Sequence, residues 1–228
     1  DNDQQLMSDM GQEGAPVHVN HTLQVAALSL LIGSSLGLPD ASLSDLGVAA
    51  MFHDVGYTSL DVTPATMKNH TSKGVRSLLR QRGFHEAKIR RMLVALQHHL
   101  PANHSPKPSL FARIVRIADD FENLTRVRDG VALMSPATAM GRMMAAAGEE
   151  YDPVLMQLFV NKLGCYPPGT ILQLDDGRWV ITTTGVRSPD TFDKPMSVLV
   201  KNADGSFTDS VVPVDLAEVD QSVTVVGT

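Results

Sequence analysis

The sequence predicts a mainly α-helical protein with a small antiparallel β region at its C-terminal end. Apolar residues recur at helical spacing through most of residues 16–163. From Gly164 onward the spacing changes, and short β-rich runs alternate with Asp-Gly turns. We therefore expect an all-α helical bundle over residues 16–163 and a β-rich subdomain over residues 164–228. Residues 1–15 are polar and are expected to form a flexible leader.

The helices follow from apolar periodicity and from the residues that start and stop helices. Pro16 suits a first helical turn, and Gly37 closes the first apolar segment. Three prolines within residues 101–108 indicate a loop. The expected helices are 16–36, 42–52, 68–82, 86–99, 110–126, 136–147 and 153–163.

The β region is predicted from its turns. An Asp-Gly pair between two β-rich runs is a strong signal for a hairpin. Asp176-Gly177 separates residues 170–174 from residues 178–184. In the same way, Asp204-Gly205 separates two further expected strands, at 196–201 and 207–212.

Composition and charge exclude several classes of function. A formal net charge of −6 argues against binding to nucleic acid polymers or to anionic membranes. The most apolar stretch, Val25 to Leu36, is shorter than the roughly 18–20 residues needed to cross a bilayer. Residues 1–14 do not have the pattern of a signal peptide, and the lone Cys165 fits a reducing compartment. We therefore expect a cytoplasmic protein without membrane contact.

Histidines and aspartates carry the chemistry. Two carboxylates are notable, because Asp54 follows His53 directly and Asp119 lies within an apolar helix. A buried carboxylate is costly unless it is paired or ligates a metal. Because Asp119 and Asp120 lie about 100° apart on that helix, one of them must approach the core. Five histidines sit where the expected helices could face one another, namely His21, His53, His70, His98 and His99.

Each of these residues also has an ordinary structural explanation. A single histidine on a helix is usually a surface residue or a satisfied core residue, and three are interpreted in this way: His18, His85 and His104. Asp54 could merely end a helix, and Asp119 could pair with Arg113 or Arg116. The complete ordered set of histidines and aspartates is harder to explain without a metal.

That order resembles the HD superfamily of metal-dependent phosphohydrolases, and most closely its HD-GYP branch, which hydrolyses cyclic di-GMP. The matching segments are His53-Asp54-Val55-Gly56, His70 with Gly74, His98-His99 and the run 112–125. The segment around Tyr166-Pro167-Pro168 also resembles the short β tail that often follows such domains. The resemblance covers roughly residues 16 to 185.

The resemblance implies a centre with two divalent metal ions, iron or manganese by family precedent. It implies that one ion is held by His21, His53, Asp54 and Asp119, and that Asp54 bridges to a second ion completed by His70, His98 and His99. Imidazole and carboxylate ligands suit iron, manganese, nickel and zinc. Two such ions can lower the pKa of a hydroxide held between them and neutralise charge on an attacked phosphate. Asp54 is therefore the expected catalytic residue.

Departures from the family pattern concern the groups that would contact substrate. Tyr57 stands where the family carries Lys, and Val17 stands where members with three metals carry Glu. The Gly-Tyr-Pro loop after the histidine pair is replaced by residues 100–108. Arg128 matches a family arginine that contacts substrate phosphate, but Val131 replaces a family lysine. We therefore predict two metals, with Arg128 as the substrate-binding residue.

The expected function is hydrolysis of a nucleotide second messenger such as cyclic di-GMP. Two alternatives stay open, a phosphohydrolase for a different nucleotide and a catalytically degenerate module that binds a nucleotide or a partner. An oxygen-sensing di-iron role is conceivable for the same ligands. The chain does not begin with Met, so a fused or partner regulatory domain is left open. The apolar residues from Val25 to Ile32 could form either a core or a homodimer interface.

Overall fold

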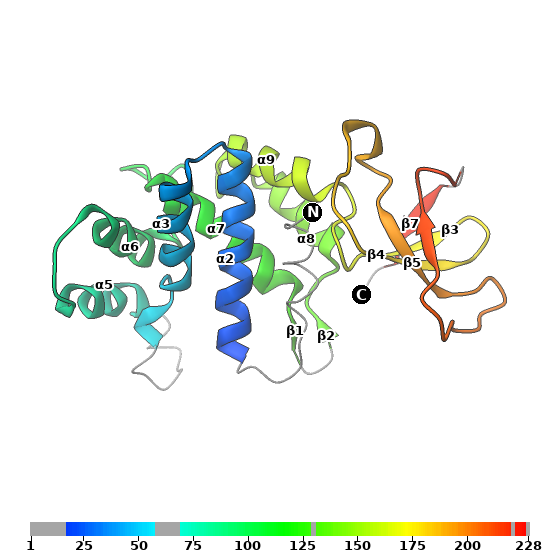
Figure 1. Cartoon of the computed structure of the whole chain (residues 1–228), viewed down its shortest axis with the longest axis horizontal. Helices are drawn as coiled ribbons and strands as arrows, with labels where there is room; N and C mark the ends of the chain where they lie inside the picture. Colours follow the sequence, from blue (N-terminus) through cyan, green and yellow to red (C-terminus); the bar gives the residue numbers. More distant parts are fainter. Residues whose placement is uncertain (1–16, 58–68, 129–130, 220–221, 227–228) are drawn as a thin grey trace. The chain divides into compact units, whose positions relative to one another are not determined.

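The computed structural model describes residues 17–57, 69–128, 131–219 and 222–226, so the leader predicted over residues 1–15 lies outside the description. Within these residues, seven α-helices precede a five-stranded antiparallel sheet (Figure 1), which confirms the predicted fold class. The chain divides into two compact units. One comprises the described parts of Asp1–Glu122 with Ala146–Leu158, and the other those of Asn123–Ala145 with Phe159–Thr228. The boundary expected at residue 163 stays a prediction.

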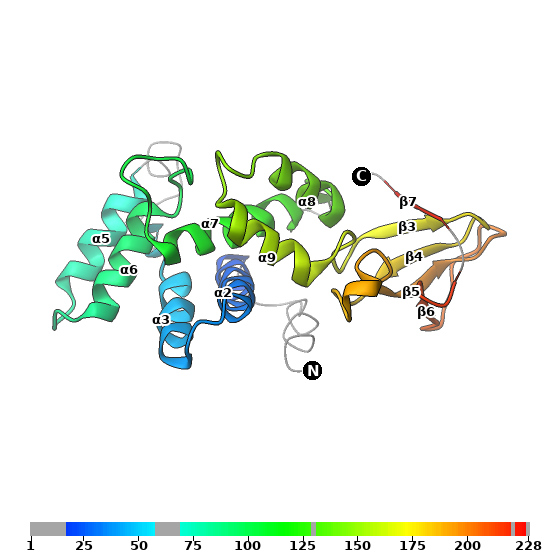
Figure 2. The same ribbon diagram turned by 90° about the horizontal axis from the view of Figure 1, so that it is seen from above.

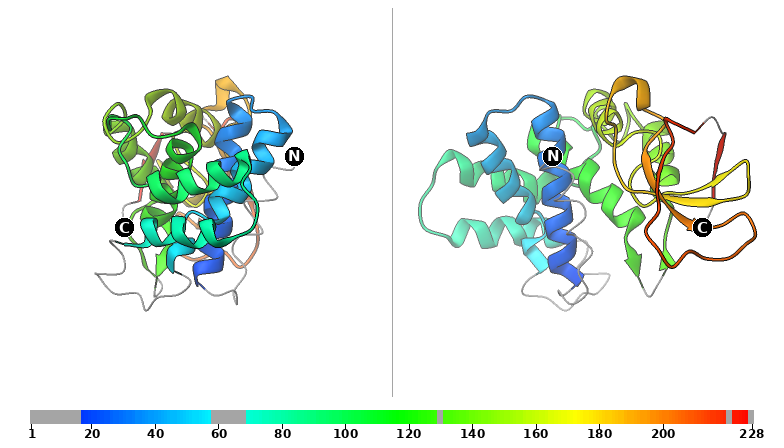
Figure 3. Two further views of the ribbon diagram at one scale, coloured as in Figure 1. Left: turned by 90° about the vertical axis from the view of Figure 1, so that its left-hand side faces the viewer. Right: turned by 45° about the vertical axis from the view of Figure 1, so that its right-hand side comes forward.

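The first unit is helical and contains the site residues. Helix α2 packs against α3, α3 against α6, and α5 against α6 (Figures 2 and 3). A short 3-10 helix, η2, packs against α5. The elements of this unit are α2 (Val17–Ser35), α3 (Asp40–Met51), η2 (Val55–Tyr57), α5 (His70–Arg80), α6 (Glu86–Gln97) and the greater part of α7 (Leu110–Thr125).

The apolar face of α2 belongs to the core of this unit. Val25, Leu28 and Ile32 are buried within the chain, and so are Ile114 and Ile117 of α7. These positions recur every three or four residues, which is the spacing of one helical face. The structure therefore uses the middle of α2 as core, and a homodimer stays a prediction.

Glycine at position 56 lets two site elements approach each other closely. A Cβ atom added at Gly56 would lie 1.9 Å from the backbone oxygen of His70, a distance that no side chain tolerates. The turn after α3 therefore packs directly on the first turn of α5. This contact brings the chain around Asp54 next to His70.

The second unit contains a short hairpin, a helix and the sheet. Strands β1 (Val127–Arg128) and β2 (Val131–Ala132) pair with each other, a hairpin that the sequence did not predict. Helix α8 spans Pro136–Ala145, and α9 (Pro153–Leu163) falls partly in each unit. The other elements are β3 (Ile171–Leu174), β4 (Trp179–Thr182), η3 (Pro189–Thr191), β5 (Met196–Lys201), β6 (Pro213–Asp215) and β7 (Val223–Val225).

The sheet is entirely antiparallel, with the strand order β6-β5-β4-β3-β7 (Figure 3, right, yellow to red). Strands β3 and β4 form the predicted hairpin, and Gly177 in its turn has a φ of 88° that favours glycine. One side of the sheet buries a small apolar cluster that includes Leu172, Val180 and Val214.

The strand expected at 207–212 is wrong. Phe207 makes only an isolated bridge to Lys201, and the next strand begins later, at Pro213. Ser210 folds back on Thr208, whose hydroxyl accepts its backbone N–H. Separate backbone hydrogen bonds from Thr208 to the Val200 carbonyl and from Leu199 to the Val212 carbonyl join the segment to β5 without a continuous ladder. Phe207 and Val211 are 70% and 80% exposed, so their β-forming side chains have no surface to pack against.

In the described part of the chain, no helix is long and apolar enough to cross a bilayer.

Candidate metal centre

The seven predicted ligands come from five helices or their ends. His21 lies in the second turn of α2, and Asp119 lies in the interior of α7. His53 and Asp54 follow the end of α3, and His70 is the first residue of α5. His98 and His99 follow the end of α6. All seven side chains converge in two adjoining groups within the first unit.

The first group consists of His21, His53 and Asp119, which are all buried. The Nε2 atom of His21 lies 3.3 Å from Oδ1 of Asp119 and 3.3 Å from Nε2 of His53. The Nε2 atom of His53 lies 3.7 Å from the same carboxylate oxygen. Three donor atoms therefore face one small volume inside the helical core.

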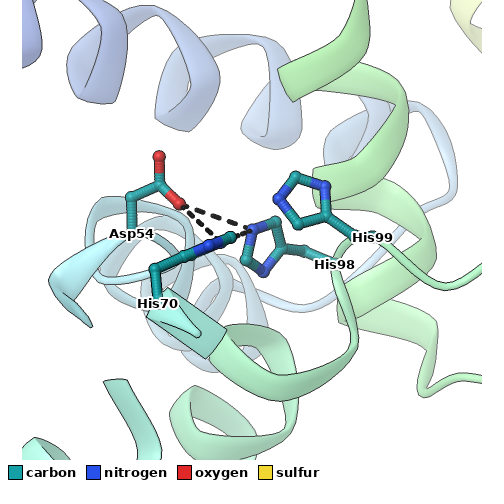
Figure 4. A group of neighbouring side chains, drawn as sticks. All are labelled: Asp54, His70, His98 and His99. Atoms are coloured by element: carbon teal, nitrogen blue, oxygen red, sulfur yellow. Dashed lines mark hydrogen bonds and ion pairs between the residues drawn. The ribbon is translucent and has the colours of Figure 1, made fainter. Parts of the chain in front are cut away.

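The second group consists of Asp54, His70, His98 and His99 (Figure 4). Oδ1 of Asp54 lies 3.3 Å from Nε2 of His70 and 3.5 Å from Nε2 of His98. The two imidazole nitrogens are 3.3 Å apart. His70 and His98 are buried, whereas His99 is exposed, so this group reaches the protein surface.

Asp54 belongs to the second group and also faces the first. Its Oδ1 atom faces the second group, while its Oδ2 atom lies 3.4 Å from Nε2 of His53 and 3.8 Å from Nε2 of His21. Oδ1 is buried, yet no hydrogen-bond donor approaches it with proper geometry. One carboxylate therefore presents one oxygen to each group, as a bridging ligand does.

The imidazole rings are held in orientations that suit metal binding. Nδ1 of His53 donates to the backbone carbonyl of Ala50 at 2.7 Å, and Nδ1 of His98 donates to that of Val94 at 3.0 Å. A ring that donates through Nδ1 keeps its lone pair on Nε2, and this arrangement is typical of metal-ligating histidines. Each ring thus turns its available nitrogen toward the centre.

The residues present fit two divalent cations. With the Nδ1 atoms of both rings engaged, the neutral forms of His21 and His53 would face each other with lone pairs 3.3 Å apart. That contact is repulsive unless a proton or a metal ion lies near both nitrogens, and a metal ion would satisfy both lone pairs at once. The under-satisfied Asp54 oxygen has the same need. Imidazole with carboxylate is a donor set that first-row transition metals accept.

The electrostatics of the two groups differ. Burial disfavours the charged form of His53, but hydrogen bonds and attraction to Asp119 and Asp54 prevail and raise its pKa to about 10. Against the effect of burial, His21 and His53 hold the pKa of Asp119 well below its usual range. Burial and the neighbouring His98 lower the pKa of His99 to about 4. The first group therefore attracts a cation strongly, while His99 remains a neutral imidazole.

Other residues singled out in the sequence lie beside the centre or outside its description. The ring of Tyr57 stacks on His70, with centroids 4.4 Å apart and planes 10° apart. The backbone of Arg128 lies in β1, but its side chain lies outside the described residues, so its role in substrate binding stays a prediction. As expected, one of the adjacent aspartates approaches the core. Asp119 is buried, whereas Asp120 is half-buried and accepts a hydrogen bond from Tyr151.

The ion pair with Arg113 or Arg116 that could have explained Asp119 does not form. Arg113 and Arg116 make ion pairs with Asp152 and Glu150. Asp119 meets His21 and His53 instead.

Sequence reasoning missed Glu122. This residue is buried, and its Oε2 atom lies 2.5 Å from Nδ1 of His21. It follows Asp119 by three positions on α7, so both side chains lie on the same face of the helix. That spacing is the signal that could have found it.

The fold and the site define a class of protein. It is a helical protein whose buried histidines and aspartates converge around one shared carboxylate. The family model described as the HD domain matches residues 19–124, a segment that contains all seven predicted ligands. The resemblance to the HD superfamily is therefore confirmed over residues 19–124.

Two known proteins are similar to this chain. The chain is 27% identical over 178 residues to cyclic di-GMP phosphodiesterase PA4108 of Pseudomonas aeruginosa, a match that covers 69% of this chain and 42% of that protein. The chain thus spans less than half the length of this curated relative. Among solved structures it is similar to Bd1817, an HDG"Y"P protein from Bdellovibrio bacteriovorus, with a TM-score of 0.55 and 20% identity. This match covers 68% of this chain and 56% of Bd1817, and it supports the fold.

Proposed function

We propose that the chain is a metal-dependent phosphodiesterase of HD-GYP type that hydrolyses cyclic di-GMP. The observation that carries this proposal is the Asp54 carboxylate, which presents Oδ2 to the first group and Oδ1 to the second. The substrate is inferred from the relative from Pseudomonas aeruginosa, which is named as a cyclic di-GMP phosphodiesterase. The cytoplasmic location, a fused regulatory domain and a homodimer stay predictions.

In this proposal, the first ion is held by His21, His53 and Asp119 together with Asp54. The second is held by His70, His98 and His99 together with the other oxygen of Asp54. Iron and manganese are the metals we favour. When bound, two such ions supply the Lewis acidity that activates a water molecule and offsets the charge on the attacked phosphate.

The protein's own residues provide position and access. Asp54 keeps the two groups close together, because its Oδ2 atom faces the first group and its Oδ1 atom faces the second. Hydrogen bonds to backbone carbonyls prevent the rings of His53 and His98 from turning. The first group is buried, whereas His99 is exposed, so we expect the phosphate to approach from the side of His99. Arg128 is the residue we propose to contact that phosphate.

A second candidate is a module that binds a nucleotide without turning it over. Tyr57 favours this candidate, because it stands where the HD-GYP family carries Lys and its ring packs flat against His70. A hydroxyphenyl group cannot supply the positive charge that a lysine would offer to phosphate. The two candidates share the metal centre and differ in catalysis.

The decisive experiment combines metal analysis with a hydrolysis assay. The chain is loaded with iron or manganese, its metal content is measured by elemental analysis, and products from cyclic di-GMP are separated by chromatography. About two metals per chain with linear or mononucleotide product would support the proposal. Two metals and tight cyclic di-GMP binding without product would favour the second candidate.

Two controls complete the design. A panel of mononucleotides tests the alternative of a phosphohydrolase with a different substrate. The His99→Ala variant should lose hydrolysis together with one metal, because it removes a ligand of the second group. No tightly bound metal in the wild-type chain after reconstitution would contradict both candidates.

A further inference from the structure

Glu122 is a buried acid that the proposed reaction does not use. Its side chain is almost fully buried in the helical core of the first unit. A carboxylate in such a place is costly unless a specific partner compensates it. Its Oε2 atom lies 2.5 Å from Nδ1 of His21, which is the distance of a charge-assisted hydrogen bond.

His21 is therefore held from both sides. Its Nδ1 atom donates to Glu122, and its Nε2 atom lies 3.3 Å from both Asp119 and His53. Because the proton is held at Nδ1, the lone pair is directed from Nε2 into the first group. Neither a rotated ring nor the other tautomer would present this lone pair.

The partner of His21 also differs in kind from the partners of two other ligands. The Nδ1 atoms of His53 and His98 face neutral backbone carbonyls. The Nδ1 atom of His21 faces a carboxylate. A charged outer partner makes an imidazole a stronger donor to a metal and adds negative charge near the ion. The first group thus has the charges of Asp54 and Asp119 next to the ion and the charge of Glu122 behind the ring of His21.

We propose that Glu122 is a positioning residue for the first metal ion, acting through His21. It holds the ring in one tautomer and orientation, and it tightens binding of the ion in the first group but not in the second. This inference rests on the proposed function, since it requires that the two groups bind metal.

The test measures metal affinity and does not depend on hydrolysis. The chain is freed of metal with a chelator and titrated calorimetrically with Mn²⁺. Glu122→Ala removes the outer carboxylate and should weaken the tighter Mn²⁺ site about 10- to 100-fold. Glu122→Gln keeps the volume and an acceptor oxygen but removes the charge, so it should weaken the same site by less. The other Mn²⁺ affinity should stay as in the wild type.

Asp120→Asn is the matched control. It removes one negative charge from the neighbouring position of α7, but this carboxylate faces Tyr151 and not an imidazole. Both Mn²⁺ affinities should stay unchanged in this variant. If Glu122→Ala does not fold, Glu122→Gln still tests the proposal because it preserves packing.

The possible outcomes separate this inference from the proposed function. Two Mn²⁺ sites with wild-type affinities in Glu122→Gln and in any folded Glu122→Ala would overturn the role of Glu122 and leave the proposed function intact. A lower melting temperature of the metal-free variant with unchanged Mn²⁺ affinity would mean a purely structural role and would also overturn it. A wild-type chain that binds no Mn²⁺ would overturn both.

Discussion

The two ligand groups share Asp54 but differ in their surroundings. In the first group, His21, His53 and Asp119 are buried, and His21 donates a hydrogen bond to a further carboxylate, Glu122. The second group includes the exposed His99 and is supported by a backbone carbonyl at His98. Electrostatic attraction is stronger where water is excluded. The first group is thus suited to retaining an ion, and the second to presenting an ion to a substrate.

The two groups also differ in where some of their ligands lie on the helices. Two residues of the first group lie within helices, His21 on α2 and Asp119 on α7, where packing covers them. Ligands of the second group lie at helix ends, with His70 at the start of α5 and His99 just past α6. Helix ends carry fewer neighbours and meet solvent more readily. A helix end alone does not expose a ligand, because His53, His70 and His98 are buried there, so the second group is accessible through His99.

The largest effect is expected from Asp54→Ala, which removes the one residue common to both groups. Both metal ions should be lost, and hydrolysis should fall by more than the roughly 10- to 100-fold that loss of an outer-shell partner costs. Elemental analysis and product chromatography measure the two effects. A variant that keeps two ions and normal hydrolysis would show that Asp54 does not bridge the groups.

A contrast in stability is expected between His53→Ala and His99→Ala in the metal-free protein. His53 is fully buried against Asp119 and Asp54, and breaking a buried ion pair costs about 3–5 kcal/mol. His99 is exposed and uncharged, so its loss should change the free energy of unfolding by no more than about 0.5 kcal/mol. Urea denaturation measures both values. Equal costs would remove the distinction between a closed and an open group.

Graded metal removal should empty the groups in sequence. As chelator is added, the ion in the second group should leave first, because its ligand His99 is exposed and the group carries less negative charge. Elemental analysis should then pass through a plateau of one ion per chain. Metal at 100 times its dissociation constant stabilises a protein by about 2.7 kcal/mol, so the melting temperature should fall in two steps. Simultaneous loss of both ions would contradict this order.

The smallest effect is expected at Tyr57, whose ring stacks on His70. Aromatic pairs contribute about 0.5–1.5 kcal/mol beyond the area they bury. Tyr57→Leu should therefore weaken Mn²⁺ binding in the second group by up to about 10-fold. Tyr57→Phe keeps the ring and should bind as the wild type does. Equal weakening in both variants would point to the hydroxyl group and not to the stack.

The helices illustrate what local patterns predict well. The expected segment 153–163 coincides with α9, and 110–126 differs from α7 by one residue. Helical periodicity and capping residues act within a few positions, so a sequence displays them directly. The strand expected at 207–212 fails for the opposite reason. A strand requires continuous pairing with a partner, and β5 meets that segment only through an isolated bridge at Phe207 and separate backbone hydrogen bonds at Thr208 and Val212.

The sequence by itself determined the mainly helical class and the ordered histidines and aspartates, whose resemblance to the HD superfamily was confirmed. That resemblance also implied that Asp54 bridges the two groups. The tertiary structure alone decided that His99 is exposed and that Glu122 meets His21 from 101 residues away. The physical reason is the range of the forces involved. Helix formation depends on neighbours along the chain, whereas contacts between distant residues depend on how the helices pack.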